Sequence, residues 1–210
     1  MIRPSLLILL LLYSLKFNAQ ADNADHKLNE LALRFFNIEP KGKNAKEIIK
    51  TLTEVLGLQT DTLIKKTDTS LFYYRGYSDR YKPFGINSKK IEIQFRESIA
   101  KEKESLLTLD TLLFLQLIAV VDSSLENLSL LEKEVRKIHK EISSFFTSYN
   151  EQKSRKRDNP AYHFYNYYYR PFALPIITLG WSASYNKQPL SCLTLTLTYR
   201  NLSDYPPERP

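Results

Sequence analysis

Apolar and polar residues alternate strictly near the end of the chain. The apolar positions are Leu193, Leu195, Leu197 and Tyr199, and the positions between them are Thr194, Thr196, Thr198 and Arg200. A period of two predicts a strand with one buried face, and β-branched threonine suits the open face. An apolar series over 173–185 predicts a preceding strand, and residues 186–189 can form the turn between the two. The pattern therefore predicts a β segment over 161–200 that ends in a C-terminal β-hairpin.

The middle of the chain, residues 58–122, has a mixed pattern. Ile91, Ile93 and Phe95 alternate with polar residues, as they do in a half-buried strand. Residues 112–121 are nearly all apolar, so they form either a buried strand or a buried helix, and periodicity does not distinguish the two. This apolar run is also too short to cross a membrane as a helix.

Two helices are predicted at the start of the chain, over 22–57. Apolar residues of the first helix recur every three or four positions from Leu28 onward. Asn44 and Glu47 can form a capping box at the start of the second helix, and Gly57 suits a left-handed stop at its end. These features predict an N-terminal helical pair.

A long amphipathic helix is predicted over 123–152 from a heptad pattern. Its apolar positions follow a spacing of three and four: Leu128, Leu131, Val135, Ile138, Ile142, Phe145 and Tyr149. Such a pattern occurs in a coiled-coil contact with a second chain and, more often at this length, in an amphipathic helix that lies on its own sheet or helices. Both interpretations stay open at this point. We therefore expect a single α+β domain over 22–200, with a disordered tail over 201–210.

The first 21 residues have the pattern of a secretory signal peptide. A positive start is followed by a short leucine-rich run and by the small pair Ala19 and Ala21. We expect cleavage between Ala21 and Asp22, and hence export to the periplasm or the medium. Removing 1–21 takes away Arg3 and Lys16, so the formal charge falls from +7 by two to +5.

Few residues point to catalysis. The single Cys192 excludes an internal disulfide, and the three histidines have no metal-binding spacing, so neither a metal nor another cofactor is expected. No nucleophile elbow and no phosphate-binding glycine loop occur. An envelope hydrolase that acts on glycan or peptide through dispersed residues remains an alternative. No catalytic residue is assigned.

Tyrosine and arginine are concentrated in two stretches, which makes binding the main functional expectation. Tyrosine offers an apolar face and a polar tip, and arginine can bind an anion or stack on a ring. The candidate binding residues are Tyr73, Tyr74, Arg75, Tyr165, Tyr167, Tyr168, Tyr169 and Arg170. We expect a protein partner in the cell envelope, with a glycan as the second ligand class. Export makes nucleic acid an unexpected partner, and contact with the membrane is expected only through the leader.

One resemblance concerns oligomers. A heptad-patterned helix followed by tyrosine-rich strands, over residues 125–200, resembles in outline the membrane anchors of trimeric autotransporters. This resemblance implies an outer-membrane-associated oligomer with a coiled-coil helix and a β anchor. The chain departs from that pattern because it ends in a proline-rich tail instead of an aromatic strand, and because its sequence shows fewer than four clear strands in this segment.

Overall fold

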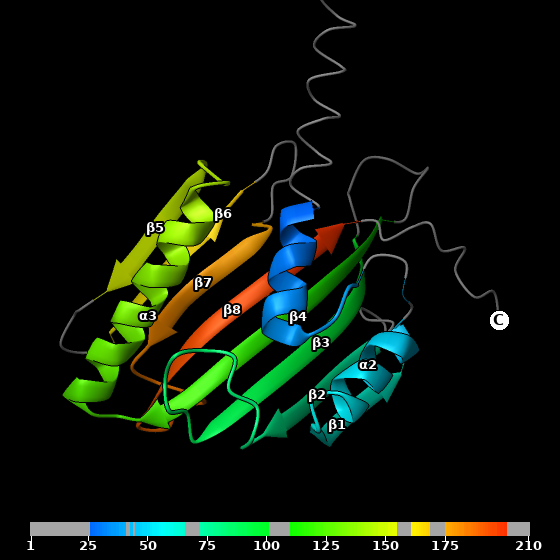
Figure 1. Ribbon diagram of the computed structural model, residues 1–210, viewed down its shortest axis with the longest axis horizontal. Helices are drawn as coiled ribbons and strands as arrows, with labels where there is room; N and C mark the ends of the chain where they lie inside the picture. The colour runs from blue at the N-terminus through cyan, green and yellow to red at the C-terminus, as the bar shows by residue number, and fades with distance from the viewer. Residues whose placement is uncertain are drawn as a thin grey trace, which may run out of the picture.

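The computed structural model describes residues 26–40, 43, 45–65, 72–100, 110–154, 161–168 and 175–200. These residues form one antiparallel sheet of eight strands with three helices on one of its faces (Figure 1). The predicted α+β class with a mainly antiparallel sheet is confirmed. The leader over 1–21, its junction at Ala21 and Asp22, and the tail over 201–210 lie outside the described residues and remain predictions.

The sheet has the strand order β1-β2-β3-β4-β8-β7-β6-β5, and every neighbouring pair is antiparallel. The strands are β1 Gln59–Lys65, β2 Phe72–Ser78, β3 Lys90–Ala100, β4 Asp110–Asp122, β5 Tyr149–Ser154, β6 Tyr162–Tyr167, β7 Ile177–Ser182 and β8 Leu190–Arg200. The two longest pairings, β3 with β4 and β4 with β8, lie at the centre. β1 and β5 form the two edges.

The apolar run over 112–121 is part of the central strand β4. Its odd positions, Leu113 to Val121, point toward the helices and belong to the main core. Its even positions Ile118 and Val120 lie on the other face, where they pack with Cys192 in a second small cluster. Because both faces of β4 are partly covered, its sequence shows no period of two.

The helices cover one face of the sheet. The first spans residues 26–36, α2 spans Ala45–Glu54 and α3 spans Leu125–Ser143. Ser124 caps α3, because its side chain accepts a hydrogen bond from the Asn127 backbone N–H. The buried residues of α3 are Leu131, Val135, Ile138 and Ile142, and they pack into the core of the same chain.

The long helix ends earlier than the heptad spacing predicts. α3 stops at Ser143, and residues 149–154 form strand β5 where helix is expected up to 152. Phe145 is 51% exposed, while its neighbour Phe146 is 6% exposed and belongs to the core. The hydroxyls of Ser143 and Ser144 donate to the Lys140 and Glu141 carbonyls, so serine side chains compete for the last turn of the helix.

Candidate functional site

The candidate tyrosines and arginines do not lie on one surface. Tyr73 and Arg75 are half-buried on the face of the sheet opposite the three described helices, called here the helix-free face, whereas Tyr74 between them is buried on the helix side. Tyr165 and Tyr167 are likewise buried on the helix side. Tyr168 is half-buried just beyond β6. Tyr169 and Arg170 lie outside the described residues. Alternation along each strand divides the tyrosines between two faces, so their density in the sequence does not produce one tyrosine surface.

A continuous row of polar residues crosses the helix-free face. Directly opposite residues of paired strands share a face, so the pairing register identifies the row. From β1 to β5 it consists of Thr62, Arg75, Gln94, Gln116, Thr196, Thr178, Asn166 and Asn150. Each of the eight strands contributes one residue. We call this set the polar row.

Side chains of the polar row hydrogen-bond one another. Gln116 Nε2 donates to Thr196 Oγ1 over 3.1 Å, at the junction of the two central strands. Thr178 Oγ1 donates to Asn166 Oδ1 over 2.9 Å. Most members of the row are half-buried, so their remaining donors and acceptors are within reach of a ligand.

Aromatic side chains flank the polar row on the same face. Phe164 packs so closely over Gly180 that a Cβ at position 180 would lie 2.3 Å from Phe164 Cδ1. The Tyr162 ring lies 6.0 Å from the Phe164 ring. At the other side of the row, the Arg96 guanidinium lies 4.5 Å from the centre of the Phe114 ring. The row therefore lies between half-buried rings.

At the β1–β3 end of the sheet, Asp61 and Glu92 accept hydrogen bonds from nearby side chains. Arg75 Nε donates to Asp61 Oδ2 over 2.6 Å, and this contact lowers the pKa of Asp61, although burial opposes it. The Glu92 side chain is 3% exposed and accepts hydrogen bonds from Tyr185 Oη and, over 2.7 Å, from Gln94 Nε2. Burial and the bond to Glu92 raise the pKa of Tyr185, so its hydroxyl stays protonated and donates.

Tyr185 belongs to a loop that folds back over the sheet. Asn186 and Lys187 have φ values of 49° and 62°, and this left-handed turn lets the loop reverse between β7 and β8. Tyr185 then packs on Ile118, Val120 and Cys192. Burial raises the pKa of the Cys192 thiol, which is therefore protonated and a poor nucleophile.

The other predicted tyrosines belong to a cluster beneath α3. Tyr165 stacks on His139 with ring centres 3.8 Å apart, and Tyr167 Oη lies 2.5 Å from His139 Nδ1. His163 Nε2 lies 2.7 Å from Glu151 Oε1 on the neighbouring strand β5. Burial lowers the pKa of His139, and it also raises the pKa of Tyr167. The cluster joins α3 to the β5 edge of the sheet.

The His139 environment predicts a loss of stability at mildly acid pH. In the folded protein, burial lowers the pKa of His139 below 6.5; Glu151 opposes this shift and His163 adds to it. As the pH falls, His139 is therefore protonated in the unfolded chain before it is protonated in the folded protein. We expect the free energy of unfolding to fall as the pH drops below about 6.5, and a His139→Gln variant to show a shallower fall. Urea unfolding at a series of pH values measures this. His26→Gln, at an exposed position, is the control, and equal slopes in both variants would contradict the assignment.

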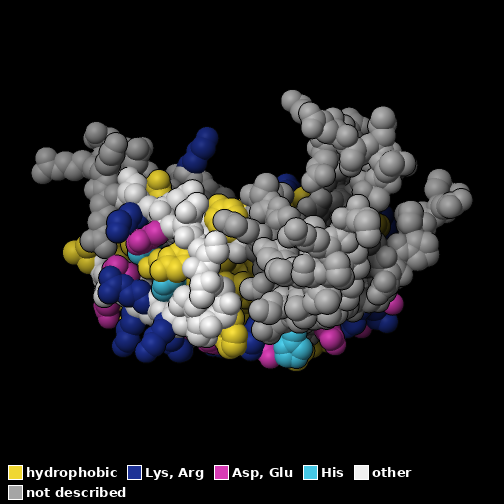
Figure 2. Space-filling view, turned by 90° about the horizontal axis from the view of Figure 1, so that it is seen from above, with side chains coloured by type: hydrophobic (Ala, Val, Ile, Leu, Met, Phe, Trp, Pro, Cys, Tyr) yellow, Lys and Arg dark blue, Asp and Glu magenta, His cyan; other side chains and the backbone are white. Residues whose placement is uncertain are grey.

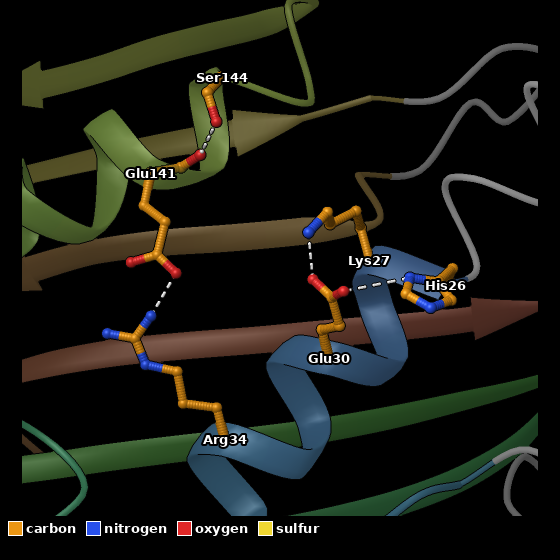
Figure 3. Close-up of polar contacts among 6 residues, drawn as sticks. All are labelled: His26, Lys27, Glu30, Arg34, Glu141 and Ser144. Carbon is orange, nitrogen blue, oxygen red and sulfur yellow. Dashed lines mark hydrogen bonds and ion pairs between the residues drawn. The ribbon is translucent and has the colours of Figure 1, made fainter.

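A small groove separates the N-terminal helix from the end of α3 (Figure 3). Its volume is about 140 Å³, and its lining includes Lys27, Leu31, Phe145 and Phe146. Arg34 pairs with Glu141 across the groove. Lys27 pairs with Glu30 and lies 3.8 Å above the Phe145 ring. The charged side chains that line the groove are therefore paired within the chain. The ion pair between Arg34 and Glu141 joins the two helices.

Basic side chains gather on the outer surface of α3. Lys133, Arg136, Lys137 and Lys140 are exposed there. Arg136 pairs with Glu132 over 2.7 Å, and Lys137 lies 3.6 Å from Glu134. Figure 2 shows Lys and Arg side chains grouped at the lower left of the view from above. This surface is on the opposite side of the sheet from the polar row.

The chain matches no known family model, and no curated protein or solved structure is significantly similar to it. Within the part of the chain that the structure describes, no helix is long and apolar enough to cross a membrane. The same described residues contain no group of three or more histidine, cysteine, aspartate or glutamate side chains placed to hold a metal ion.

Proposed function

We propose that the protein is an exported, non-catalytic binding protein of the cell envelope, and that the helix-free face of its sheet is the ligand surface. Export rests on the signal-peptide pattern over 1–21. The observation that carries the binding function is the polar row, which crosses all eight strands between half-buried aromatic rings.

The helix-free face supports this function better than the heptad helix does. The apolar positions Leu131, Val135, Ile138 and Ile142 of α3 pack into the core of their own chain, which favours an amphipathic helix on its own sheet over a coiled-coil seam. The opposite face of the sheet instead keeps half-buried amide, hydroxyl and aromatic groups accessible. Aromatic groups beside polar ones are the composition that binding surfaces favour.

The test uses a double variant in the centre of the polar row. Gln116 and Thr196 hydrogen-bond each other, so replacing both with alanine removes the donor and the acceptor together. No polar side chain then loses its partner, and we expect the fold to be preserved. Lys133→Ala/Lys140→Ala on α3 is the matched control on the helix side. We expect the wild-type protein to sediment with isolated envelope fragments of its source cells. The loss of about two hydrogen bonds should weaken binding of the Gln116→Ala/Thr196→Ala variant about tenfold, with no change in the control.

Two results would refute the proposal. One is a wild-type protein that stays in the supernatant at every envelope concentration. The other is a Gln116→Ala/Thr196→Ala variant that binds as tightly as the wild type while its circular dichroism shows an intact fold.

A further inference from the structure

We propose that the ligand on the helix-free face is a chain of neutral, β-linked sugars that lies across the strands and meets the side chains of the polar row one after another. This inference rests on the proposed function, because it names the ligand class of the same surface. Three features of the face support it: its charge, its spacing and its aromatic rings.

The charge of the polar row favours a neutral ligand. From Gln94 to Asn150 the row contains six side chains, all of them amides or hydroxyls. The single charged member, Arg75, is neutralised by Asp61. A polyanion would need several unpaired cations here, whereas amides and hydroxyls both donate to and accept from sugar hydroxyl and acetamido groups.

The spacing of the row suits a repeating ligand. Neighbouring strands lie about 4.8 Å apart, so successive members of the row present polar groups at that interval. This interval is close to the length of one sugar residue in a β-linked chain. An extended sugar chain at right angles to the strands would therefore place about one sugar over each strand, next to the half-buried members of the row.

The rings beside the row supply the apolar part of the site. The close contact of Phe164 with Gly180 shows that the ring packs against the sheet at a position without a side chain. Phe164 and Tyr162 are both half-buried. The C–H face of a sugar ring packs on such an aromatic face, while its hydroxyls stay free to bond the neighbouring polar row. The pair is therefore placed to stack a sugar above β6 and β7.

An extended peptide fits this face less well than a sugar chain. Peptide strands gain most of their affinity by pairing with the backbone of a sheet edge, whereas six of the eight members of the polar row lie on inner strands that are paired on both sides. Cores of protein interfaces are also rich in exposed aromatic and arginine anchors, whereas the centre of this row is Gln116 and Thr196. A protein partner is the outcome against which the sugar ligand is tested.

The experiment repeats the envelope sedimentation after the envelopes have been digested with proteinase K and washed with hot detergent, which leaves polysaccharide. We expect the wild-type protein to remain bound and the Gln116→Ala/Thr196→Ala variant to bind about tenfold more weakly. Oligomers of β-1,4-linked glucose and N-acetylglucosamine, from two to six sugars long, are added as competitors. At least one series should compete at lower concentration as its length grows, because each added sugar meets a further strand.

The outcomes separate the ligand class from the function. Binding to untreated envelopes that disappears after digestion overturns the sugar ligand and leaves the binding function in place, with a protein as the partner. Failure to bind untreated envelopes overturns both proposals. Competition that is absent at every length, or equal at every length, also overturns the proposed arrangement across the strands.

Discussion

Replacing Phe36 with alanine is expected to destabilise the protein by about 3–5 kcal/mol, the usual cost of removing a buried phenylalanine ring. Phe36 is 0% exposed and belongs to the main core, although it comes from the short helix over 26–36. The same helix accepts hydrogen bonds from Tyr199 Oη of β8 at the Leu28 carbonyl and from Tyr81 Oη, in the segment between β2 and β3, at the Phe35 carbonyl. The N-terminal helix is therefore packed into the main core, and removing the Phe36 ring should destabilise the whole domain.

The same helix provides the control for this measurement. Leu33 is 57% exposed, so Leu33→Ala should change the free energy of unfolding by no more than about 0.5 kcal/mol. Urea unfolding followed by circular dichroism gives both values. If Phe36→Ala and Leu33→Ala had equal effects, the N-terminal helix would not be packed on the sheet as described.

Replacing Gly180 with alanine is expected to destabilise the protein by about 1–3 kcal/mol through overpacking. A Cβ at this position would lie 2.3 Å from Phe164 Cδ1 and 2.4 Å from the His163 carbonyl oxygen. The ring can move aside, but the carbonyl belongs to the paired strand β6 and cannot move without disturbing the pairing. Thermal unfolding of the variant measures the combined cost.

A double-variant cycle separates the two contacts of Gly180. Phe164→Ala should relieve the part of the Gly180→Ala penalty that comes from the ring and leave the part that comes from the carbonyl. We therefore expect the penalty of Gly180→Ala to be smaller in the Phe164→Ala background but not zero. Full additivity of the two substitutions would show that the ring does not pack on Gly180.

The elements that the sequence predicts well are those with only one face on the main core. Ile91, Ile93 and Phe95 alternate with polar residues because only one face of β3 lies on the main core, and the same holds for Leu193 to Tyr199 in β8. The second helix is expected over 44–57 and is observed as α2 over Ala45–Glu54. In these segments the local pattern identifies the side chains that lie on the main core. The open face expected for the threonines of β8 is wrong in part, because Thr194 and Thr198 are also buried and only Thr196 is half-buried.

The end of α3 and the strand β5 could not be predicted from local spacing alone. The heptad pattern continues past Ser143 only because Phe145 and Tyr149 happen to fall in phase, while the core contact is made by Phe146. Strand β5, Tyr149–Ser154, has a sequence without apolar alternation, so its composition does not indicate a strand. In both places the pairing with β6 decides the structure, and that pairing is not visible in a local window.

The polar row could not be predicted from the sequence either. Its eight members come from eight strands, and only the complete pairing register places them in line. One partial signal was present, because Gln94, Gln116 and Thr196 each occupy a polar position inside an apolar or alternating run. The tyrosine-rich stretch predicts binding residues on β6, but alternation places Tyr165 and Tyr167 in the core and Phe164 on the helix-free face.

The strand order contains an approximate twofold relation. A helix followed by four consecutive antiparallel strands occurs twice, first as α2 with β1–β4 and then as α3 with β5–β8, and the last strands of the two halves, β4 and β8, meet at the centre. Gln116 and Thr196, one from each half, lie directly opposite each other where the two halves meet. A chain bound along the polar row would meet the same order of strands from either end. The backbone therefore sets no direction for such a ligand, and polarity must come from side chains that differ between the halves, with Arg75 on β2 where β6 has Asn166.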